Sequence, residues 1–468
     1  MMKLSRRHLL RGGAALAGAG FLPRLGYDAA HAADTNGYRA LVCVFFKGGM
    51  DGHDVLLPYD QPSYDRYREI RGPLMDSYGR NEAGARRTRN ELLELSPTNA
   101  SDFGSRRFAL PPEMAGLHDL FTDGKAAIVA NTGPLLESLD RTAYRERTGM
   151  RPPRLFSHND QQSTWMALAP EGRRFGWGGM FADAHIAANA NDVSAFTAIS
   201  VAGNDVFLSG ENVSQYQVSG KGANTVRELT QSKLLGSGHR SETAQRLLDE
   251  HFRGAGMTRS NLFERDMNTI SRRSIEINTL FNDSTVNAPP LLTEFPDTRL
   301  GGQLQSIAQT IDSRTVLGAK RQIFFAAIGG FDTHSGQASS LPGRQREISE
   351  AIASFYAATE EMGIAQDVTL FTASDFGRTL AVNGDGSDHG WGGHQFVVGG
   401  GVNGGRIYGD VPPAELDHQW DSGRGRLIPT TSIEQFAAPM GRWFGLNESE
   451  ISGTLPLLNR FGPVPTFI

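Results

Sequence analysis

The chain has 468 residues, 39% of them hydrophobic, and a formal net charge of −5 at pH 7. It is long enough to bury a large core, and its length would allow more than one domain. So small a net charge gives no support to nucleic acid as a partner, and Arg86, Arg87 and Arg89 are predicted to lie on a solvated helix face. The single cysteine, Cys43, excludes an internal disulfide and is predicted to be buried.

The amino terminus has the pattern of an export signal. Residues 5–10 (SRRHLL) are a twin-arginine sequence, residues 12–22 are apolar and rich in glycine and alanine, and residues 30–32 (AHA) fit a cleavage site. The apolar stretch is too short and too rich in glycine for a stable membrane span. We therefore expect residues 1–32 to be a signal peptide and the mature protein to be periplasmic or extracellular.

The rest of the chain alternates apolar runs with helical patterns. Strands are predicted where short apolar runs are bounded by turn residues, at 39–46, 125–130, 196–201, 322–328, 367–373 and 396–398. Helices are predicted from apolar spacing at 110–121, 161–168, 304–312 and 345–363. Strands separated by helices are typical of a parallel α/β sheet, so we expect an α/β domain over residues 38–468.

Two stretches interrupt this alternation. Residues 59–107 are polar and rich in arginine, and we expect them to form a surface insertion. The second insertion covers about 203–299 and has long helical periodicity at 223–251 and 260–281. We expect this helical insertion to cover the site and to help select the substrate.

Five clusters of acidic residues and histidine lie beside glycine or other small residues, and three of them follow an apolar run. They are KGGMDGHD (47–54), LFSHNDQQ (155–162), GGFDTHSGQ (329–337), ASDFGRT (373–379) and SDHGWGGH (387–394). The carboxyl ends of parallel strands meet at one edge of a sheet, so clusters that are distant in sequence can form one site there. The pattern therefore predicts a metal-type active site.

Carboxylates and imidazoles in these clusters are candidate metal ligands, because both bind divalent cations. The candidates are Asp51, Asp332, His334, Asp375, Asp388 and His389. A carboxylate and an imidazole two residues apart, as in residues 332–334, suit zinc, with calcium or magnesium as alternatives. The glycines beside Asp51 fit a turn or helix N-cap as an alternative role.

The candidate catalytic residues are Ser157, His158, Arg378 and His394. Ser157 precedes a predicted helix, where a metal and the helix dipole would stabilise an alkoxide nucleophile; the same position also suits an N-cap. Arg378 can bind an anion through its bidentate guanidinium, and His158 or His394 can protonate a leaving group. His394 is equally well explained as a hydrogen-bonded histidine.

These motifs closely resemble the exported bacterial family called domain of unknown function 1501, over nearly all of the mature chain. The resemblance lies in GGMDG (48–52), NTGPL (131–135), SHNDQQ (157–162), FDTH (331–334), SDFGRT (374–379) and DHGWGGHQFVVGGGVNGGRIYGDVP (388–412). The family looks related to the alkaline phosphatase and sulfatase superfamily. That relation implies an alkaline-phosphatase-like parallel-sheet three-layer sandwich with a helical insertion, and metal ions at the carboxyl edge of the sheet.

The relation also implies roles for individual residues. Asp51 would be the metal ligand after the first strand, and Ser157 would be the nucleophile. Asp332 and His334 resemble an acid and a histidine that bind one metal, Asp375 the carboxylate of the next strand, and His389 the last histidine ligand. The chain departs from the superfamily pattern at Phe376, where a histidine typically follows the aspartate, and in the shorter spacing of residues 332–334. One ion rather than two is therefore an alternative.

From these features we expect an exported metal-dependent hydrolase of phosphate or sulfate esters, acting on a small anionic ester or sugar ester. The alternative is a non-catalytic exported binding or assembly protein that keeps the sulfatase-like fold, which Phe376 favours. A metallopeptidase or amidase ranks last because the sequence has no recognisable peptidase helix motif. We expect no nucleic acid partner and no stable membrane span, and the sequence predicts no particular protein partner.

Overall fold

A computed structural model describes residues 33–80, 86–219, 222–223, 246–247, 250, 261–285 and 288–468. The predicted signal peptide, residues 1–32, lies outside the described residues, as does most of the helix predicted at 223–251. Within the described ranges, no helix is both long enough and apolar enough to cross a membrane.

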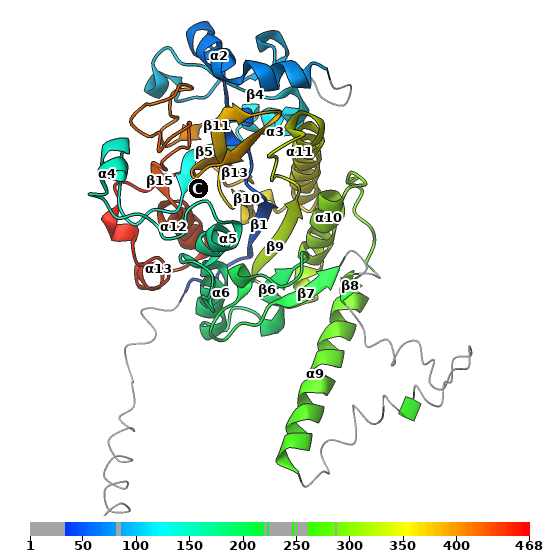
Figure 1. The fold of residues 1–468 in the computed structure, drawn as a ribbon. Helices are drawn as coiled ribbons and strands as arrows, with labels where there is room; N and C mark the ends of the chain where they lie inside the picture. The colour runs from blue at the N-terminus through cyan, green and yellow to red at the C-terminus, as the bar shows by residue number, and fades with distance from the viewer. Residues whose placement is uncertain are drawn as a thin grey trace, which may run out of the picture.

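A large sheet forms the centre of the molecule (Figure 1). Its middle is parallel and contains, side by side, β10 (Val368–Ser374), β1 (Arg39–Lys47), β9 (Arg321–Gly329), β6 (Ala198–Ser200) and β7 (Tyr216–Ser219). Next to β10, β13 (Gly393–Gly399) runs antiparallel both to β10 and to β5 (Ala126–Gly133). The edges hold the short strands β14 (Ile407–Tyr408), β15 (Thr431–Ser432) and β8 (Gly222–Ala223).

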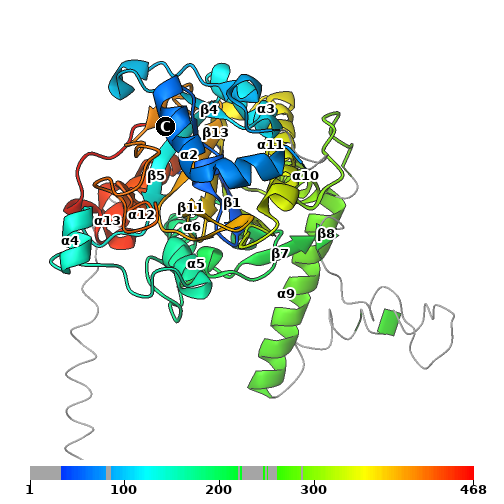
Figure 2. The same ribbon diagram turned by 45° about the horizontal axis from the view of Figure 1, so that its top comes forward.

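Alternate side chains of β1 face two different cores. Ala40, Val42 and Val44 belong to one core. That core also contains side chains of α3 (Ala115–Thr122), α10 (Arg299–Asp312) and α11 (Gln337–Glu361). Leu41, Cys43 and Phe45 belong to the other. It contains side chains of α5 (His158–Ala167), α6 (Trp177–Ala187), α12 (Ile433–Phe444) and α13 (Glu448–Thr454). A strand buried on both faces needs a continuous apolar run. The expected three-layer α/β sandwich is confirmed, and so is the burial of Cys43 (Figures 1 and 2).

Each strand and helix predicted outside the second insertion overlaps a strand or helix of the structure, with shifts at the ends. The largest shift is at α11, which begins at Gln337 rather than at residue 345. Pro342 and Gly343 lie in its first two turns, and both residue types disfavour helix interiors, so the apolar spacing becomes clear only after them. The earlier start is important because it makes Gln337, which donates a hydrogen bond to Asp51, the first residue of the helix.

Residues 59–80 and 86–107 form one end of the molecule, at the top of Figure 1. They contain α2 (Gln61–Tyr78), η2 (Arg89–Glu91), β3 (Leu93–Glu94) and η3 (Ala100–Phe103), and β3 joins β4 (Phe108–Leu110) and β2 (Leu57–Pro58) in a small sheet. The predicted solvated arginine face is wrong for Arg87, which is buried and pairs with Asp54 at 3.0 Å and Glu113 at 2.9 Å. One guanidinium therefore contacts two buried acids, which local sequence does not reveal.

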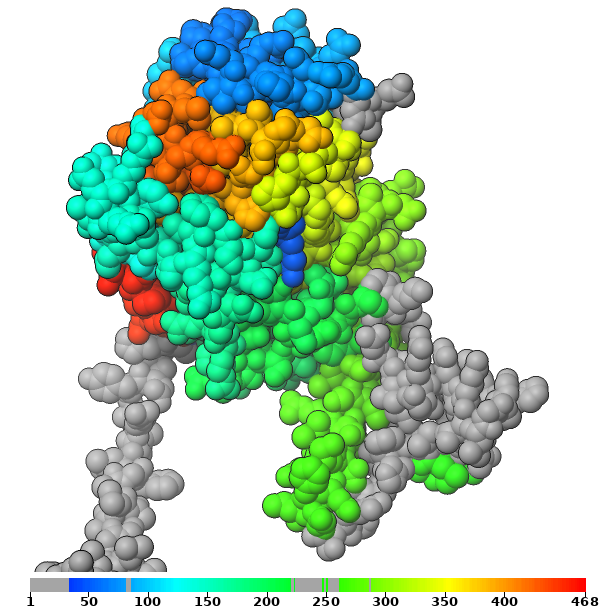
Figure 3. Space-filling model, in the orientation of Figure 1, coloured from blue at the N-terminus to red at the C-terminus, as the bar shows by residue number. Residues whose placement is uncertain are grey.

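The described part of the second insertion lies at the β8 edge of the sheet. It contains η6 (Val206–Leu208), β7, β8 and the long helix α9 (Leu262–Thr285). Figures 1 and 3 show α9 extending away from the central sheet and the helices that cover it. The remaining short elements are η1 (Gly52–Asp54), η4 (Pro112–Met114), α4 (Arg141–Glu146), η5 (Ser194–Phe196), η9 (Ser313–Thr315), η10 (Ala365–Asp367), β11 (Arg378–Asn383), β12 (Gly386–His389) and η11 (Leu458–Arg460).

Candidate metal centre

Loops after three adjacent parallel strands form the candidate site. β1 ends before Gly48, β9 leads to Asp332, and β10 leads to Asp375. Gly48 has a φ of +118°, and a Cβ built there would lie 2.5 Å from the backbone nitrogen of Asp332, so a larger residue would push the two loops apart. The strand order β10-β1-β9 therefore brings the loops to one edge of the sheet, as expected for parallel strands.

Three histidines and one aspartate meet at this edge, and we call them the histidine–aspartate group: His158 from α5, Asp332 and His334 after β9, and His389 from β12. His389 Nε2 and His334 Nε2 lie 3.2 and 3.1 Å from Asp332 Oδ1. The same two nitrogens are 2.8 Å apart. His158 Nε2 lies 3.4 Å from Asp332 Oδ2. Ligand atoms of His158, Asp332 and His389 all lie within 4.8 Å of one another.

The outer nitrogen of each imidazole faces an oxygen acceptor. His389 Nδ1 lies 2.8 Å from the Phe156 carbonyl oxygen. His334 Nδ1 lies 3.3 Å from Asp388 Oδ1, and His158 Nδ1 lies 2.7 Å from Asp375 Oδ2. These acceptors assign the proton of each neutral ring to Nδ1 and leave a lone pair on Nε2. Three lone pairs then face one carboxylate, an arrangement that a bound cation would stabilise and that metal-binding histidines usually show.

Asp375 supports the group from the protein interior. Its Oδ2 accepts hydrogen bonds from His158, from Gln162 Nε2 at 3.0 Å and from the Gly48 N–H at 3.1 Å. Its Oδ1 is buried and has no hydrogen-bond partner in the described part of the chain. Such an oxygen is costly to bury unless a further partner compensates it, and a metal ion is a suitable partner. The hydrogen bond with Asp375 also raises the pKa of His158, which indicates a negative local field.

Arg378 and Asp388 hold the group in place. Arg378 is buried and donates to the carbonyl oxygens of Gly48 at 2.9 Å and Ser387 at 3.1 Å, and to Asp332 Oδ1 at 3.2 Å. Asp388 Oδ2 pairs with Arg424 at 2.8 Å, while its Oδ1 accepts from His334. Burial alone would raise the pKa of Asp332, but Arg378 and His158 outweigh it and keep the pKa below its ordinary value. Arg378 and Asp388 therefore contact the histidine–aspartate group without belonging to it.

Asp51 lies in a separate buried ion pair. Arg71 Nη1 is 2.6 Å from Asp51 Oδ2, and Arg71 Nη2 is 3.1 Å from Oδ1. Gln337 Nε2 donates to Oδ2 at 2.6 Å, and the His53 N–H donates to Oδ1 at 3.2 Å. Both oxygens are therefore engaged by protein donors, and the structure does not bring Asp51 into the histidine–aspartate group. The N–H of His53 makes Asp51 the N-cap of η1, which was the alternative role.

Ser157 occupies the N-cap position of α5, directly before His158. Its hydroxyl makes no capping hydrogen bond; it donates instead to Asp160 Oδ2 at 2.9 Å. Asp160 also pairs with Arg154 at 3.0 Å. Burial would raise the pKa of Asp160, but the hydrogen bonds from Ser157 and Arg154 lower it further than burial raises it. Among the described residues, the Ser157 hydroxyl makes no hydrogen bond to the histidine–aspartate group.

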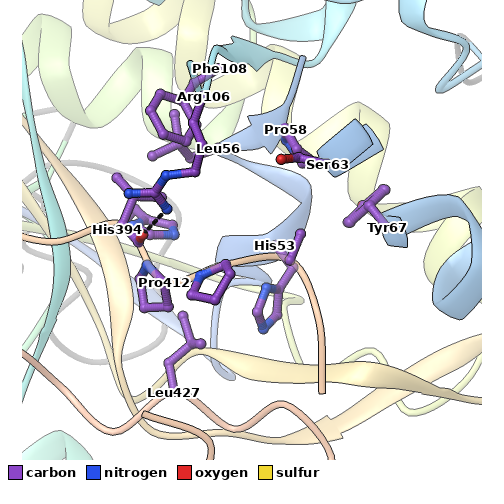
Figure 4. A pocket seen from close by; sticks show the side chains of 13 residues that line it. His53, Leu56, Pro58, Ser63, Tyr67, Arg106, Phe108, His394, Pro412 and Leu427 are labelled. Carbon is purple, nitrogen blue, oxygen red and sulfur yellow. Dashed lines mark hydrogen bonds between the residues drawn. The ribbon is translucent and has the colours of Figure 1, made fainter. Parts of the chain in front are cut away.

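His394 lines a different cavity, shown in Figure 4 together with His53. Its Nδ1 accepts a hydrogen bond from the Asn131 N–H at 3.2 Å, and burial lowers its pKa to about 3. The cavity has a volume of about 30 Å³, which is room for about one or two waters. The structure therefore does not bring His394 to the histidine–aspartate group, and its neighbouring cavity is too small for an ester substrate.

Sequence analysis gave no role to two glutamines that donate hydrogen bonds to buried carboxylates. Gln162 and Gln337 donate to the carboxylates of Asp375 and Asp51. Gln162 lies inside the SHNDQQ motif, so its place in that motif was an available signal. Phe376, the position where the sequence departs from the superfamily pattern, has its ring centroid 4.8 Å from that of His158 and 4.6 Å from that of His389. An apolar ring therefore packs against two of the three imidazoles.

Comparisons with known proteins identify the chain's family. The model of the family described as "Protein of unknown function (DUF1501)" matches residues 38–451. No curated protein matches the chain. Similar solved structures include Ps i-CgsB in complex with k-i-k-neocarrahexaose, at 10% identity over 91% of this chain and 77% of that chain, with a TM-score of 0.35. Another is a variant of the alkaline phosphatase PafA, at 9% identity over 73% and 63% of the chains, with a TM-score of 0.25. Scores this low define neither fold nor activity.

Proposed function

For this chain, which belongs to the DUF1501 family, we propose a metal-dependent hydrolase of phosphate or sulfate esters. The observation that carries the proposal is the convergence of three imidazole Nε2 atoms on the Asp332 carboxylate, with distances of 3.1 to 3.4 Å. Imidazole and carboxylate ligands together favour zinc, whereas calcium and magnesium prefer sites made of oxygen atoms. His158, Asp332, His334 and His389 would hold the ion.

A zinc ion in this group would polarise an ester oxygen and stabilise negative charge on the phosphoryl or sulfuryl group. The chain's own residues supply the nucleophile and its orientation. Ser157 offers a hydroxyl next to His158, and this hydroxyl donates a hydrogen bond to Asp160 Oδ2, with 2.9 Å between the two oxygens. Asp375 and the Phe156 carbonyl fix the imidazoles of His158 and His389. The leaving-group proton is not assigned to His394, because burial lowers its pKa to about 3.

Packing around Phe376 supports one ion rather than two. Its side chain is 2% exposed and fills the space beside His158 and His389 with carbon atoms. A second ion beside the first would need a ligand at this position, and a benzyl ring offers none. We therefore propose a single-ion site.

A binding or assembly protein without turnover remains the second candidate, and Arg378 favours it. Arg378 is 1% exposed, and its guanidinium already donates hydrogen bonds to carbonyl oxygens and to Asp332. It is therefore a weak candidate for gripping an anionic substrate, the role that the sequence had suggested.

Metal analysis and an ester screen distinguish the two functions. The mature protein is purified without chelator, its metal content is measured by mass spectrometry, and hydrolysis of aryl phosphates and aryl sulfates is followed. We expect one zinc per chain and turnover that falls at least 100-fold in Ser157→Ala. The exposed Ser101 supplies the matched control, because Ser101→Ala should keep full activity. Bound metal without turnover on any ester supports the binding protein, and absence of bound metal contradicts the metal site.

We also propose export through the twin-arginine pathway, on the basis of residues 5–10 and 30–32. Cell fractionation of the chain and of its Arg6→Lys, Arg7→Lys double variant provides the test. Retention of the double variant in the cytoplasm is the expected result, and equal export of both forms would contradict this part of the proposal.

A further inference from the structure

Within the described part of the chain, helix α9 packs against the body near its C-terminus. Near its C-terminus the Phe281 ring is 2% exposed and its centroid lies 5.3 Å from that of Tyr216. The Tyr216 hydroxyl also donates to Asn278 Oδ1 at 2.8 Å. The 24-residue helix is about 36 Å long, and its N-terminal half extends beyond the body in Figures 1 and 3. The helix therefore presents its N-terminal half at a distance from the sheet.

The extended half carries an exposed apolar face. Leu262, Phe263, Met267 and Ile270 are 64%, 73%, 48% and 61% exposed. Positions 263, 267, 270, 274, 277 and 281 alternate in steps of four and three, and all are apolar except Ser274. This is the heptad spacing of a two-helix coiled coil. Its last two positions pack against the body, so the same stripe that anchors α9 continues outward without cover from the body's core.

Charge favours an antiparallel partner of identical sequence. If Met267 packs against Ile270 of a second copy, Asp266 of each copy lies beside Arg273 of the other. Asp266 and Arg273 are both exposed and flank the apolar stripe. Two such ion pairs form per dimer because the contact is two-fold symmetric. In a parallel pair Asp266 would instead face Ser271, which is uncharged.

The position of the anchor also favours the antiparallel arrangement. With Met267 opposite Ile270, residue 262 of one copy lies opposite Ile275 of the other, just before the anchored positions 277–281. The two bodies then lie at opposite ends of the helix pair, about 37 Å apart when measured between the two Phe281 positions. A parallel pair would place both bodies at the same end, where they would compete for space.

We propose that the N-terminal half of α9 pairs with α9 of a second copy of this chain as an antiparallel, two-fold symmetric coiled coil. Phe263, Met267 and Ile270 form its apolar seam, and Asp266 and Arg273 set its direction. The pairing is independent of the proposed hydrolase activity, because none of these residues belongs to the histidine–aspartate group.

Sedimentation velocity of the mature chain over a concentration series tests the pairing. The wild type should form a species of twice the monomer mass, and Met267→Glu with Ile270→Glu should stay monomeric. Asp266→Arg and Arg273→Asp should each weaken self-association at least tenfold, because each change brings like charges together. An equimolar mixture of these two single variants should restore the dimer, because each contact then joins arginine to aspartate.

Several outcomes would overturn the proposal. They are a wild type that stays monomeric at every concentration, a dimer that survives Met267→Glu with Ile270→Glu, and a mixture that associates no better than its components. Circular dichroism melting curves of all variants check folding, and the charge variants should melt with the wild type because both positions are exposed.

Discussion

Replacing Arg71 by leucine is expected to destabilise the fold while leaving the metal site occupied. Arg71 and Asp51 have side-chain exposures of 1% and 0%, and two of the hydrogen bonds to the Asp51 carboxylate come from this guanidinium. Removing one partner of a buried ion pair costs about 3–5 kcal/mol, because the other charge stays buried and uncompensated. A typical domain is stable by only about 5–15 kcal/mol, so the loss should be easy to measure.

Urea unfolding followed by circular dichroism gives the free energy of unfolding, and mass spectrometry gives the metal content of the same samples. Arg68→Leu is the matched control: it lies on the same helix and its pair with Asp76 is exposed, at 50% and 56%, so the loss should stay below about 1 kcal/mol. Asp51→Asn should also destabilise the protein and keep one ion per chain. The reasoning is refuted if Arg71→Leu costs less than 1 kcal/mol, or if Asp51→Asn loses the ion with unchanged unfolding energy.

Three further predictions concern the metal site and one buried acid. His389→Ala and His334→Ala should each bind less than a tenth of the wild-type zinc. His118 lies outside the group, so His118→Ala should bind the full amount. Equal loss of zinc in all three variants would contradict the assigned ligands. Phe376→His should raise the metal-to-protein ratio above one, because it adds an imidazole beside His158 and His389; an unchanged ratio in a folded variant would show that Phe376 is not what limits the site to one ion. Glu434 is 3% exposed, and burial raises its pKa to about 7. Its stabilising contribution is complete below the unfolded pKa of about 4.3 and is lost as pH rises toward 7. Glu434→Gln should therefore gain roughly 3–4 kcal/mol over the wild type at pH 8, and parallel unfolding-energy curves from pH 4 to pH 8 would argue against it.

The central strands were predictable because burial on both faces imposes a continuous apolar run. The run from residue 39 to 46 became β1 with a shift of a single residue at one end. The direction of β13 was not predictable, because an antiparallel strand buried on both faces has the same apolar pattern as a parallel one. The pairing of Arg87 with Asp54 and Glu113 was also hidden, since it joins residues that are 33 and 26 positions apart.

The sequence indicated which chemical groups reach the sheet edge, but not what each group contacts there. Asp332, His334 and His389 lie in the motifs that were singled out. Strand order places the loop of Asp332 and His334, whereas His389 comes from β12 of the separate β11–β12 sheet. Asp51 lies in an equally suggestive motif after the first strand. Its different environment comes from Arg71 on α2, part of an insertion whose docking no local pattern reveals. The role of a buried carboxylate therefore depends on the cation that long-range packing places opposite it.

The charges around the histidine–aspartate group also favour a metal ion. Asp51 is matched by Arg71, Asp54 by Arg87 and Asp388 by Arg424. Two carboxylates then remain at the group, Asp332 and Asp375, with Arg378 as the guanidinium that contacts Asp332. With neutral imidazoles the group carries one net negative charge, and Asp375 Oδ1 stays buried without a hydrogen-bond partner among the described residues. An extra proton on His158 would balance this charge, but that ring would then no longer offer the Nε2 lone pair that faces Asp332. A divalent cation uses all three lone pairs and turns the net charge of −1 into +1, which suits an anionic ester. The use of the lone pairs is why the geometry favours a metal ion over a protonated histidine.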